Sequence, residues 1–171
     1  ITILLFHSLE ARTDTDPPKP GLNESSLKGL EWRGIGPALM AGRVADIAVH
    51  PTDRSTWYVG VGSGGVWKTV NRGITWTPVF DDQGAYSIGS ITIDPNQPNT
   101  VWVGTGENVG GRHVAYGDGV YRSLDGGSTW KNMGLGKSEH IGNILVDPRD
   151  SNIIYVAAQG PLWSAGGERG V

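Results

Sequence analysis

One short segment of the chain, residues 107–118, concentrates side chains that could bind a ligand or take part in acid–base chemistry. Carboxylates accept hydrogen bonds and exchange protons, a guanidinium donates from a planar fork, and an imidazole titrates near neutral pH. Long loops on a rigid scaffold often carry binding function, so we expect a ligand site or a partner contact here. The alternative is a surface loop whose polar groups satisfy one another. The candidate residues are Glu107, Asn108, Arg112, His113, Tyr116 and Asp118.

The catalytic groups of a glycosidase are not evident in this sequence. Such enzymes place two carboxylates on either side of the scissile bond, or use a tyrosine nucleophile in sialidases, which also need an arginine cluster. Arg43 and Arg112 could face a central cleft, but turn stabilisation or a surface ion pair explains two loop arginines more simply. His113 has no second histidine at ligand spacing. We therefore predict no catalytic residue, no metal site and no cofactor for this sequence.

The composition excludes several classes of protein. The 171 residues carry a net charge of −3, and no block of basic residues indicates a nucleic-acid partner. The absence of cysteine excludes disulfides and thiolate metal sites. The 27 glycines and 10 prolines favour short strands joined by tight turns over helices.

The hydrophobic pattern predicts strands in three successive cycles. Each cycle opens with a short apolar run that ends at a proline, and these prolines (Pro51, Pro95 and Pro148) are 44 and 53 residues apart. A four-stranded unit of about 40–50 residues is the period of a β-propeller blade. Small residues in the inner strands suit the crowded centre of such a fold. The expected strands cover 44–49, 56–61, 66–69, 75–80, 88–93, 100–105, 119–123, 129–133, 141–146 and 153–158.

One eight-residue pattern occurs twice, at 69–76 and 123–130, and both copies fit Ser/Thr-x-Asp/Asn-x-Gly-x-Thr-Trp. An acidic or amide side chain can accept backbone N–H groups of a tight turn, and glycine permits a positive φ there. We expect each copy to be a hairpin turn with a tryptophan packed beneath it, and we assign it no catalytic role. Arg72 replaces Gly126 at a position that we expect to be variable. The residues of this structural box are Thr69, Asn71, Gly73, Thr75 and Trp76, and then Ser123, Asp125, Gly127, Thr129 and Trp130.

These boxes resemble the Asp-box (BNR) repeats of the sialidase-like and sortilin-like propeller superfamily, over about Leu30 to the C-terminus. The segments 32–37, 42–44 and 117–121 are similar to bacterial exported proteins of the sortilin-like or glycosyl-hydrolase-like type. The resemblance implies an all-β fold of four-stranded antiparallel propeller blades with Asp-box hairpins. That superfamily includes sialidases, xyloglucan-active glucanases, receptor ectodomains and a photosystem II assembly factor. A shared fold transfers none of these activities by itself.

The expected organisation is an N-terminal arm with a Pro-rich linker at 1–29, followed by an incomplete propeller at 30–171. Within the propeller we expect an orphan outer strand at 30–37, blades at 44–80 and 88–133, and a partial blade at 141–171. About two and a half blades are fewer than the four of the smallest closed propellers. The sequence therefore predicts part of a larger propeller, or open strand edges that a partner covers.

The first six residues form an apolar run that is too short to span a bilayer. It is the remnant of a signal peptide or an anchor for a membrane or a partner, and a disordered leader is the third alternative. Either of the first two interpretations predicts a periplasmic or extracellular protein, with membrane association in the second. The anchor residues would be Ile1, Ile3, Leu4, Leu5 and Phe6.

The function expected from these features is a non-catalytic binding or scaffold role. The protein would be an exported accessory subunit docked on a larger assembly, for which a membrane-embedded or photosynthetic complex is a candidate. One alternative is a glycoside hydrolase or sialidase-like enzyme whose catalytic residues lie outside this segment. Another is a carbohydrate- or protein-binding receptor module. The expected partners are proteins that cover the open edges, and no nucleic acid.

Overall fold

The structure, a computed structural model, describes Lys28 and residues 42–171. The expected outer strand at 30–37 and the apolar arm lie outside the described residues. The chain divides into residues 1–36 and residues 37–171, and every described strand belongs to the second unit. Among the described residues there is no helix with the length and hydrophobicity needed to cross a bilayer.

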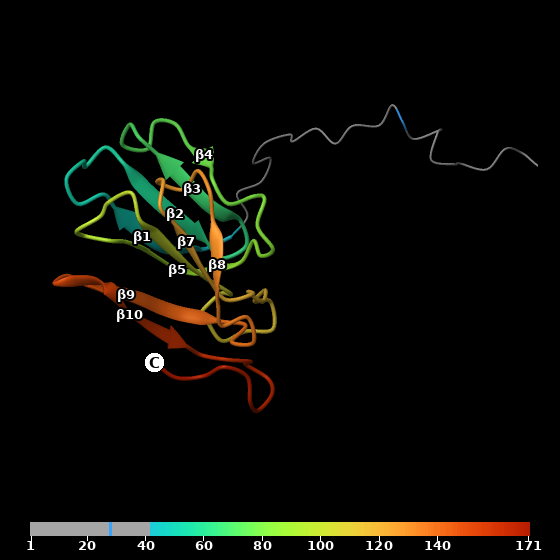
Figure 1. The fold of residues 1–171 in the computed structure, drawn as a ribbon. Helices are drawn as coiled ribbons and strands as arrows, with labels where there is room; N and C mark the ends of the chain where they lie inside the picture. The colour runs from blue at the N-terminus through green and yellow to red at the C-terminus, as the bar shows by residue number, and fades with distance from the viewer. Residues whose placement is uncertain (1–27, 29–41) are drawn as a thin grey trace, which may run out of the picture. The chain divides into compact units, whose positions relative to one another are not determined.

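The fold is all-β and consists of antiparallel sheets whose strands follow chain order, as expected for partial propeller blades (Figure 1). In Figure 1, β9 lies next to β5, and β10 lies on the far side of β9. The first sheet contains β1 (Val44–Val49), β2 (Trp57–Val61), β3 (Gly65–Thr69) and β4 (Thr77–Pro78). The second contains β5 (Ile88–Ile93), β6 (Val101–Thr105), β7 (Val120–Ser123) and β8 (Lys131–Gly134). The third contains β9 (Ile141–Asp147) and β10 (Asp150–Ala158).

The register of the strands makes the three sheets comparable residue by residue. The pairs Ile47–Val59, Ile91–Val103 and Ile144–Val156 occupy the same place in their sheets. Each sheet also has a register shift near the start of its first strand. These pairs therefore align the three sheets, so that each position in one sheet has a counterpart in the next.

Glycine in the second strand lets each sheet approach the next one closely. A Cβ atom on Gly60 would lie 2.7 Å from Cγ2 of Ile88, the first residue of β5. A Cβ atom on Gly104, the equivalent residue of the second sheet, would lie 2.7 Å from Cβ of Ile141, the first residue of β9. No real Cβ is found at such distances, so these two strands must carry glycine where the next sheet begins. This is the crowded centre that the small residues predict.

Hydrogen bonds join the first strands of successive sheets. Asp46 in β1 accepts the backbone N–H of Ile91 in β5 at 2.9 Å. The hydroxyl of Thr92 in β5 donates to the carbonyl of Ile144 in β9 at 2.6 Å. Side-chain to backbone bonds of this kind fix the axial alignment of the sheets as well as their distance.

The hydrophobic core lies between the sheets and repeats from one interface to the next. At each interface, an aromatic residue of one second strand packs on the aliphatic side chains of the following sheet. The first interface is built from Tyr58, Val66 and Phe80 against Ile88, Ile91, Ile93, Val101, Val103 and Tyr121. The second is built from Trp102 and Val120 against Ile141, Ile144 and Val146, with Leu135, Ile154 and Val156 partly buried beside them.

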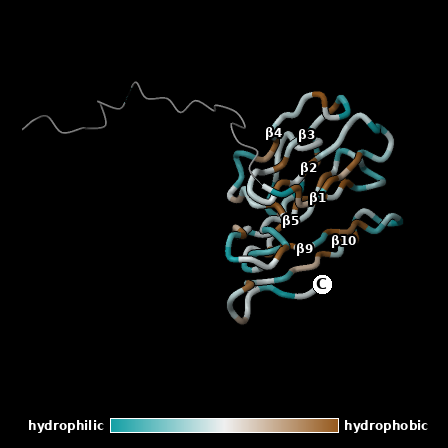
Figure 2. Tube along the Cα trace, turned by 180° about the vertical axis from the view of Figure 1, so that it is seen from behind, coloured by the Kyte–Doolittle hydropathy of each residue, from teal (hydrophilic) through white to brown (hydrophobic). Residues whose placement is uncertain are grey.

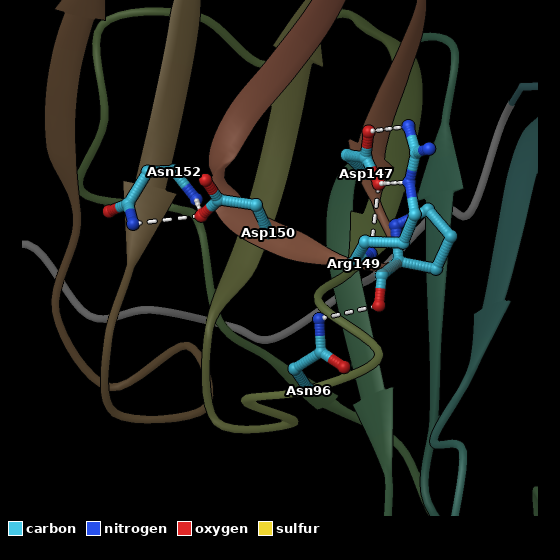
Figure 3. A network of polar contacts seen from close by, with 6 residues as sticks. Asn96, Asp147, Arg149, Asp150 and Asn152 are labelled. Atoms are coloured by element: carbon cyan, nitrogen blue, oxygen red, sulfur yellow. Dashed lines mark hydrogen bonds and ion pairs between the residues drawn. The ribbon is translucent and has the colours of Figure 1, made fainter.

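The turns that follow β5 and β9 join the second and third sheets at the end where these two strands finish. Asp94 accepts the backbone N–H of Asn96 at 2.8 Å, as the first residue of an Asx turn does. Asn96 donates in turn to the carbonyl of Pro148 at 3.1 Å, and Figure 3 shows this link. Arg149 binds both carboxylate oxygens of Asp147 and holds the pKa of that carboxyl below its usual value. The carboxylates of Asp94 and Asp147 therefore have a structural role in these turns.

Both box turns have the same hydrogen-bond pattern. In the second copy, Asp125 accepts the N–H of Thr129 at 2.8 Å and its hydroxyl at 2.6 Å, while Ser123 donates to Asp125 at 2.7 Å. The Ser123 hydroxyl also accepts the N–H of Gly127 at 2.8 Å. Asn71, Thr69 and Thr75 repeat these contacts in the first copy, except that the Asn71 amide donates to the Thr75 hydroxyl at 2.8 Å instead of accepting from it.

The residue before the box glycine is not freely variable. Gly126 has a φ of 68°, and Arg72 has a φ of 59° at the same place in the first turn. A side chain in the left-handed region carries a conformational cost that glycine avoids. The position thus accommodates Arg72 in place of glycine, with a conformational cost.

The second box turn also docks the second sheet on the first. The carbonyl of Gly126 accepts hydrogen bonds from the Tyr58 hydroxyl at 2.9 Å and from Lys68 Nζ at 2.8 Å. Burial, with the nearby charge of Asp125 as a smaller cause, raises the pKa of Tyr58 to about 12. Trp130 donates from its indole to the carbonyl of Val79 at 2.6 Å. The turn is thus a contact between sheets, beyond its role within one hairpin.

We predict that Gly104→Ala destabilises the protein because the new methyl group meets Ile141. Overpacking of this kind costs about 1–3 kcal/mol in the free energy of unfolding. Gly110→Ala is the control, since nothing lies within 4 Å of a Cβ at that position. Urea unfolding followed by tryptophan fluorescence would measure both, and equal midpoints for the two variants would contradict the packing argument.

We predict that Asp125→Asn removes part of the loss of stability in acid. Hydrogen bonds, those from Thr129 foremost, lower the pKa of Asp125 from 3.8 to about 2. A lowered pKa stabilises the folded state above the unfolded-state value, and this contribution disappears as pH falls through the folded-state value. Asn71 fills the same place in the first turn, so asparagine keeps the turn intact. The midpoint of thermal unfolding should depend less on pH in the variant than in the unmodified protein between about pH 4 and pH 2. An equal pH dependence of the two midpoints would refute the lowered pKa of Asp125.

Candidate functional site

The candidate site lies at the end of the sheets where β1, β5 and β9 begin. The residues that directly precede β1, β5 and β9 occupy equivalent positions. In each case the backbone carbonyl accepts a hydrogen bond from the N–H of the residue that follows the second strand of the same sheet. The three bonds are Gly62 to Arg43 at 2.9 Å, Gly106 to Ser87 at 2.7 Å, and Gln159 to His140 at 2.9 Å. Because successive first strands pack side by side, Arg43, Ser87 and His140 form a row across the three sheets.

Glu107 contacts every member of this row. Its carboxylate pairs with Arg43, its backbone N–H donates to the Ser87 hydroxyl at 3.0 Å, and its carbonyl faces His140 Nδ1 at 2.8 Å. A Cβ atom on Gly62 would lie 2.6 Å from the carboxylate carbon of Glu107, so this carboxylate packs directly on the end of β2. One residue therefore joins three sheets at this end of the fold. We call these four residues the Glu107 cluster.

The Glu107 cluster is buried and retains hydrogen-bonding capacity. Glu107 is 2% exposed and His140 is fully buried, whereas half of the Arg43 side chain meets solvent. Since His140 Nδ1 faces a carbonyl, it carries the proton, and Nε2 is the acceptor. Neither His140 Nε2 nor Glu107 Oε2 has a hydrogen-bond partner among the described residues. These two enclosed atoms can therefore accept a hydrogen bond from a buried water molecule.

The other candidate residues of the 107–118 loop divide into two groups. Asn108 donates to the carbonyl of Gly142 at 3.1 Å, and the Tyr116 ring lies 5.5 Å from the His140 ring, so both adjoin the Glu107 cluster. Arg112 and His113 are exposed near the tip of the loop and make no hydrogen bond or ion pair with the described residues. The structure brings Glu107, Asn108 and Tyr116 together and leaves Arg112 and His113 apart.

Asp118 supports the base of the loop. It accepts the hydroxyl of Tyr121 at 2.6 Å, and its backbone N–H donates to the Thr105 hydroxyl at 2.8 Å. Burial, and next the hydrogen bond to Asp118, raise the pKa of Tyr121 above its usual value. The carboxylate of Asp118 is thus committed to orienting a buried phenol.

The arrangement is better suited to binding than to proton transfer. The described residues include no group of three or more His, Asp or Glu side chains that could hold a metal ion. The Tyr116 ring, which is 57% exposed, lies beside His140, and Tyr86, which is 62% exposed, directly precedes Ser87 in the chain. Exposed rings beside hydrogen-bonding side chains can stack on the apolar face of a polar ligand.

Sequence reasoning missed Ser87 and His140 as members of the site. Nothing in their local sequence marks them, but both directly precede the apolar run that opens a cycle, as Arg43 does. Aligning the cycles at that position would have placed the three residues in one row.

The chain is similar to known xyloglucanases in sequence and in structure, although no protein-family model matches it. It is 28% identical over 155 residues to a xyloglucanase of Hypocrea jecorina, covering 80% of this chain and 18% of that protein. It is 27% identical over 144 residues to a xyloglucanase of Acetivibrio thermocellus, covering 67% of this chain and 16% of that protein. The structure of a GH74 enzyme of Niastella koreensis superposes with a TM-score of 0.54 at 26% identity, and the match covers 71% of this chain and 18% of that enzyme. The chain thus spans less than a fifth of the length of these relatives.

These similarities correct the expected function. We expected a non-catalytic accessory subunit of a larger complex, but the proteins that match in sequence and in fold are glycan-degrading enzymes. The scaffold interpretation is therefore wrong, and the glycoside hydrolase alternative fits better. The open sheet edges that motivated the scaffold interpretation are equally compatible with a segment of a larger enzyme.

We predict that Arg43→Ala destabilises the protein more than Glu107→Gln. The first change leaves a buried carboxylate without its partner, which costs about 3 kcal/mol, the low end for a broken buried pair because Arg43 is half exposed. The second keeps a hydrogen-bonding side chain and costs about 1 kcal/mol. The double variant should be more stable than Arg43→Ala alone in urea unfolding. A double variant as unstable as the sum of the single changes would show that the pair is not coupled.

Proposed function

We propose that this chain forms part of a glycoside hydrolase that acts on xyloglucan. The observation that carries the proposal is the agreement of sequence and structure comparisons on xyloglucanases, at 27–28% identity in sequence and at a TM-score of 0.54 for the fold. Within the described residues, the exposed Tyr116 ring beside the buried Glu107 cluster has the character of a sugar-binding contact.

The chemistry of the described residues supports a binding role within such an enzyme. Hydrolysis requires two carboxylates on opposite sides of the glycosidic bond. Glu107 is committed to Arg43, and Asp118 to Tyr121. Neither of these two carboxylates is free to react, so this segment contributes contacts to the substrate through Tyr116 and Asn108.

Two finer assignments accompany the proposal. We place the repeated turns in the Asp-box class, because both use an Asp or Asn side chain to accept the same backbone N–H four residues on. We also place the protein outside the cytoplasm, because a polymeric glucan does not cross a membrane and must be met where it occurs.

We predict that the 171-residue chain binds xyloglucan oligosaccharides and that Tyr116→Ala weakens this binding about tenfold. The loss corresponds to one aromatic contact of about 1.4 kcal/mol. Isothermal titration calorimetry with branched xyloglucan fragments, and with unbranched cello-oligosaccharides for comparison, would measure the effect.

Tyr155→Ala provides a matched control for this titration. Tyr155 is 51% exposed, much like Tyr116, but it lies in β10 away from the Glu107 cluster. Equal losses for the two variants, or no binding of xyloglucan fragments by the unmodified chain, would overturn the proposed binding surface.

A further inference from the structure

A small pocket lies between the first and the second box turn. Its volume is about 230 Å³, below the roughly 300–1,000 Å³ of sites that enclose a drug-sized ligand. One wall comes from β3, β4 and the first box turn, and the other from residues 126–128 of the second box turn. The lining residues of the first wall are Lys68, Val70, Thr75, Thr77 and Val79. The pocket therefore suits one small polar ligand, about the size of a sugar ring.

Lys68 brings a positive charge without a counter-ion to this pocket. It pairs with Tyr58 on β2 and with Thr77 on β4, so these three side chains lie on the same face of the first sheet. The ammonium donates to the carbonyl of Gly126 at 2.8 Å and lies 5.3 Å from the centre of the Tyr58 ring. An ammonium has three N–H donors, and Lys68 forms no ion pair with a carboxylate of the described residues. Two of its donors therefore remain for a ligand.

The asparagine of the first box turn leaves a second donor free. In the second turn, the hydroxyl of Thr129 donates to the carboxylate of Asp125 at 2.6 Å. In the first turn, Asn71 Oδ1 accepts the backbone N–H of Thr75 at 2.9 Å, and its amide N–H donates to the Thr75 hydroxyl at 2.8 Å. Because the Thr75 oxygen accepts this bond, its own O–H can donate to a ligand in the pocket. Asparagine also removes a negative charge that aspartate would place beside Lys68.

The groups that line the pocket indicate the class of ligand. Lys68 and Thr75 offer hydrogens to a negatively charged group, and Thr77 contributes a further hydroxyl. The turn that joins β3 to β4 carries hydrophobic residues between hydrophilic ones (Figure 2), and Val70 and Val79 give the pocket an apolar side. A cation among hydroxyls and aliphatic side chains fits a ligand that has a carboxylate, several hydroxyls and an apolar ring face. A sugar acid has all three.

We propose that the pocket between the two box turns binds a uronic acid unit of an acidic glycan. The carboxylate of the sugar accepts the free N–H groups of Lys68 and the O–H of Thr75. Its ring hydroxyls bond to Thr77 and Ser128, and its apolar ring face packs on Val70.

This pocket is separate from the surface around Tyr116. The box turn follows the end of β3, where Thr69 pairs with Trp57 at the start of β2. The Glu107 cluster packs instead on Gly62, which follows the end of β2. The acidic sugar would therefore bind at the other end of the sheets from the proposed xyloglucan contact.

The test is an NMR titration of the 171-residue chain with glucuronate at constant ionic strength. The backbone amide resonances of Thr75 and of residues 126–128 should shift as the pocket fills. Glucose, which lacks the carboxylate, should bind about tenfold more weakly, because it loses a charge-assisted hydrogen bond. Acetate, which lacks the sugar ring, should also bind more weakly than glucuronate.

Asn71→Asp is the most specific variant for this titration. Asp125 shows that aspartate keeps such a turn folded, since it accepts the backbone N–H of Thr129 as Asn71 accepts that of Thr75. In the variant, the Thr75 hydroxyl donates to the new carboxylate, whose charge also opposes that of the ligand. Glucuronate should therefore bind about tenfold more weakly, while glucose binding changes little.

Lys68→Met removes the charge and keeps most of the aliphatic stem, and Tyr58 still donates to the carbonyl of Gly126. This variant should also lose about tenfold in affinity for glucuronate. Lys131→Met is the matched control, because Lys131 is an exposed lysine of β8 that does not line the pocket. It should bind glucuronate normally. Urea unfolding of each variant would show that its fold is kept.

The absence of shifts with glucuronate, or undiminished binding in a folded Asn71→Asp variant, would overturn the proposal. Equal affinities for acetate and glucuronate would overturn it as well, since the pocket would then take any small anion. A blocked glutamate peptide that binds as tightly as glucuronate would show that the occupant is a protein segment, and would equally rule out the sugar.

Discussion

The close approach of successive sheets at their inner strands is the constraint on which the rest of this structure depends. Gly60 and Gly104 leave no room for a side chain because Ile88 and Ile141 begin the next sheet at that point. With the sheets at this distance, Asp46 and Thr92 can reach the backbone of the following first strand. The same spacing brings Tyr58 and Lys68 to the box turn of the second sheet. The close approach at Gly60 and Gly104 therefore determines both the packing between the sheets and the polar contacts that join them.

The Glu107 cluster is a consequence of that spacing. Arg43, Ser87 and His140 each precede a first strand, and they become neighbours only because β1, β5 and β9 lie side by side. Glu107 can then bond to all three from a loop of the middle sheet. Its burial makes it a structural centre, while Tyr116 beside His140 stays exposed. Within the loop, buried Glu107 holds the three sheets together and exposed Tyr116 remains accessible to a ligand.

Much of the fold could be predicted because its signals are local. The apolar runs, the Asp-Pro turns at 94 and 147, and the two boxes each depend on residues a few positions apart. Other features could not be found in this way. The positive φ of Arg72 is imposed by the turn, whatever the residue. His140 looks like an ordinary turn residue until its neighbours from other sheets are known. The scaffold interpretation failed for a related reason, because open edges show that something is absent without showing what it does.

The sequence by itself determined the strand periodicity, the tight turns and the all-β propeller architecture, since these rest on side-chain alternation and on the conformational preferences of glycine, proline and asparagine-like residues. It also determined that the 107–118 loop stands out chemically. Only the tertiary structure decided that Glu107 belongs with Arg43, Ser87 and His140, and that Asp118 serves Tyr121. It also decided that the Gly126 carbonyl belongs to Tyr58 and Lys68. The physical reason is that these contacts join residues from different parts of the chain, and the distance between them is set by the packing of whole sheets.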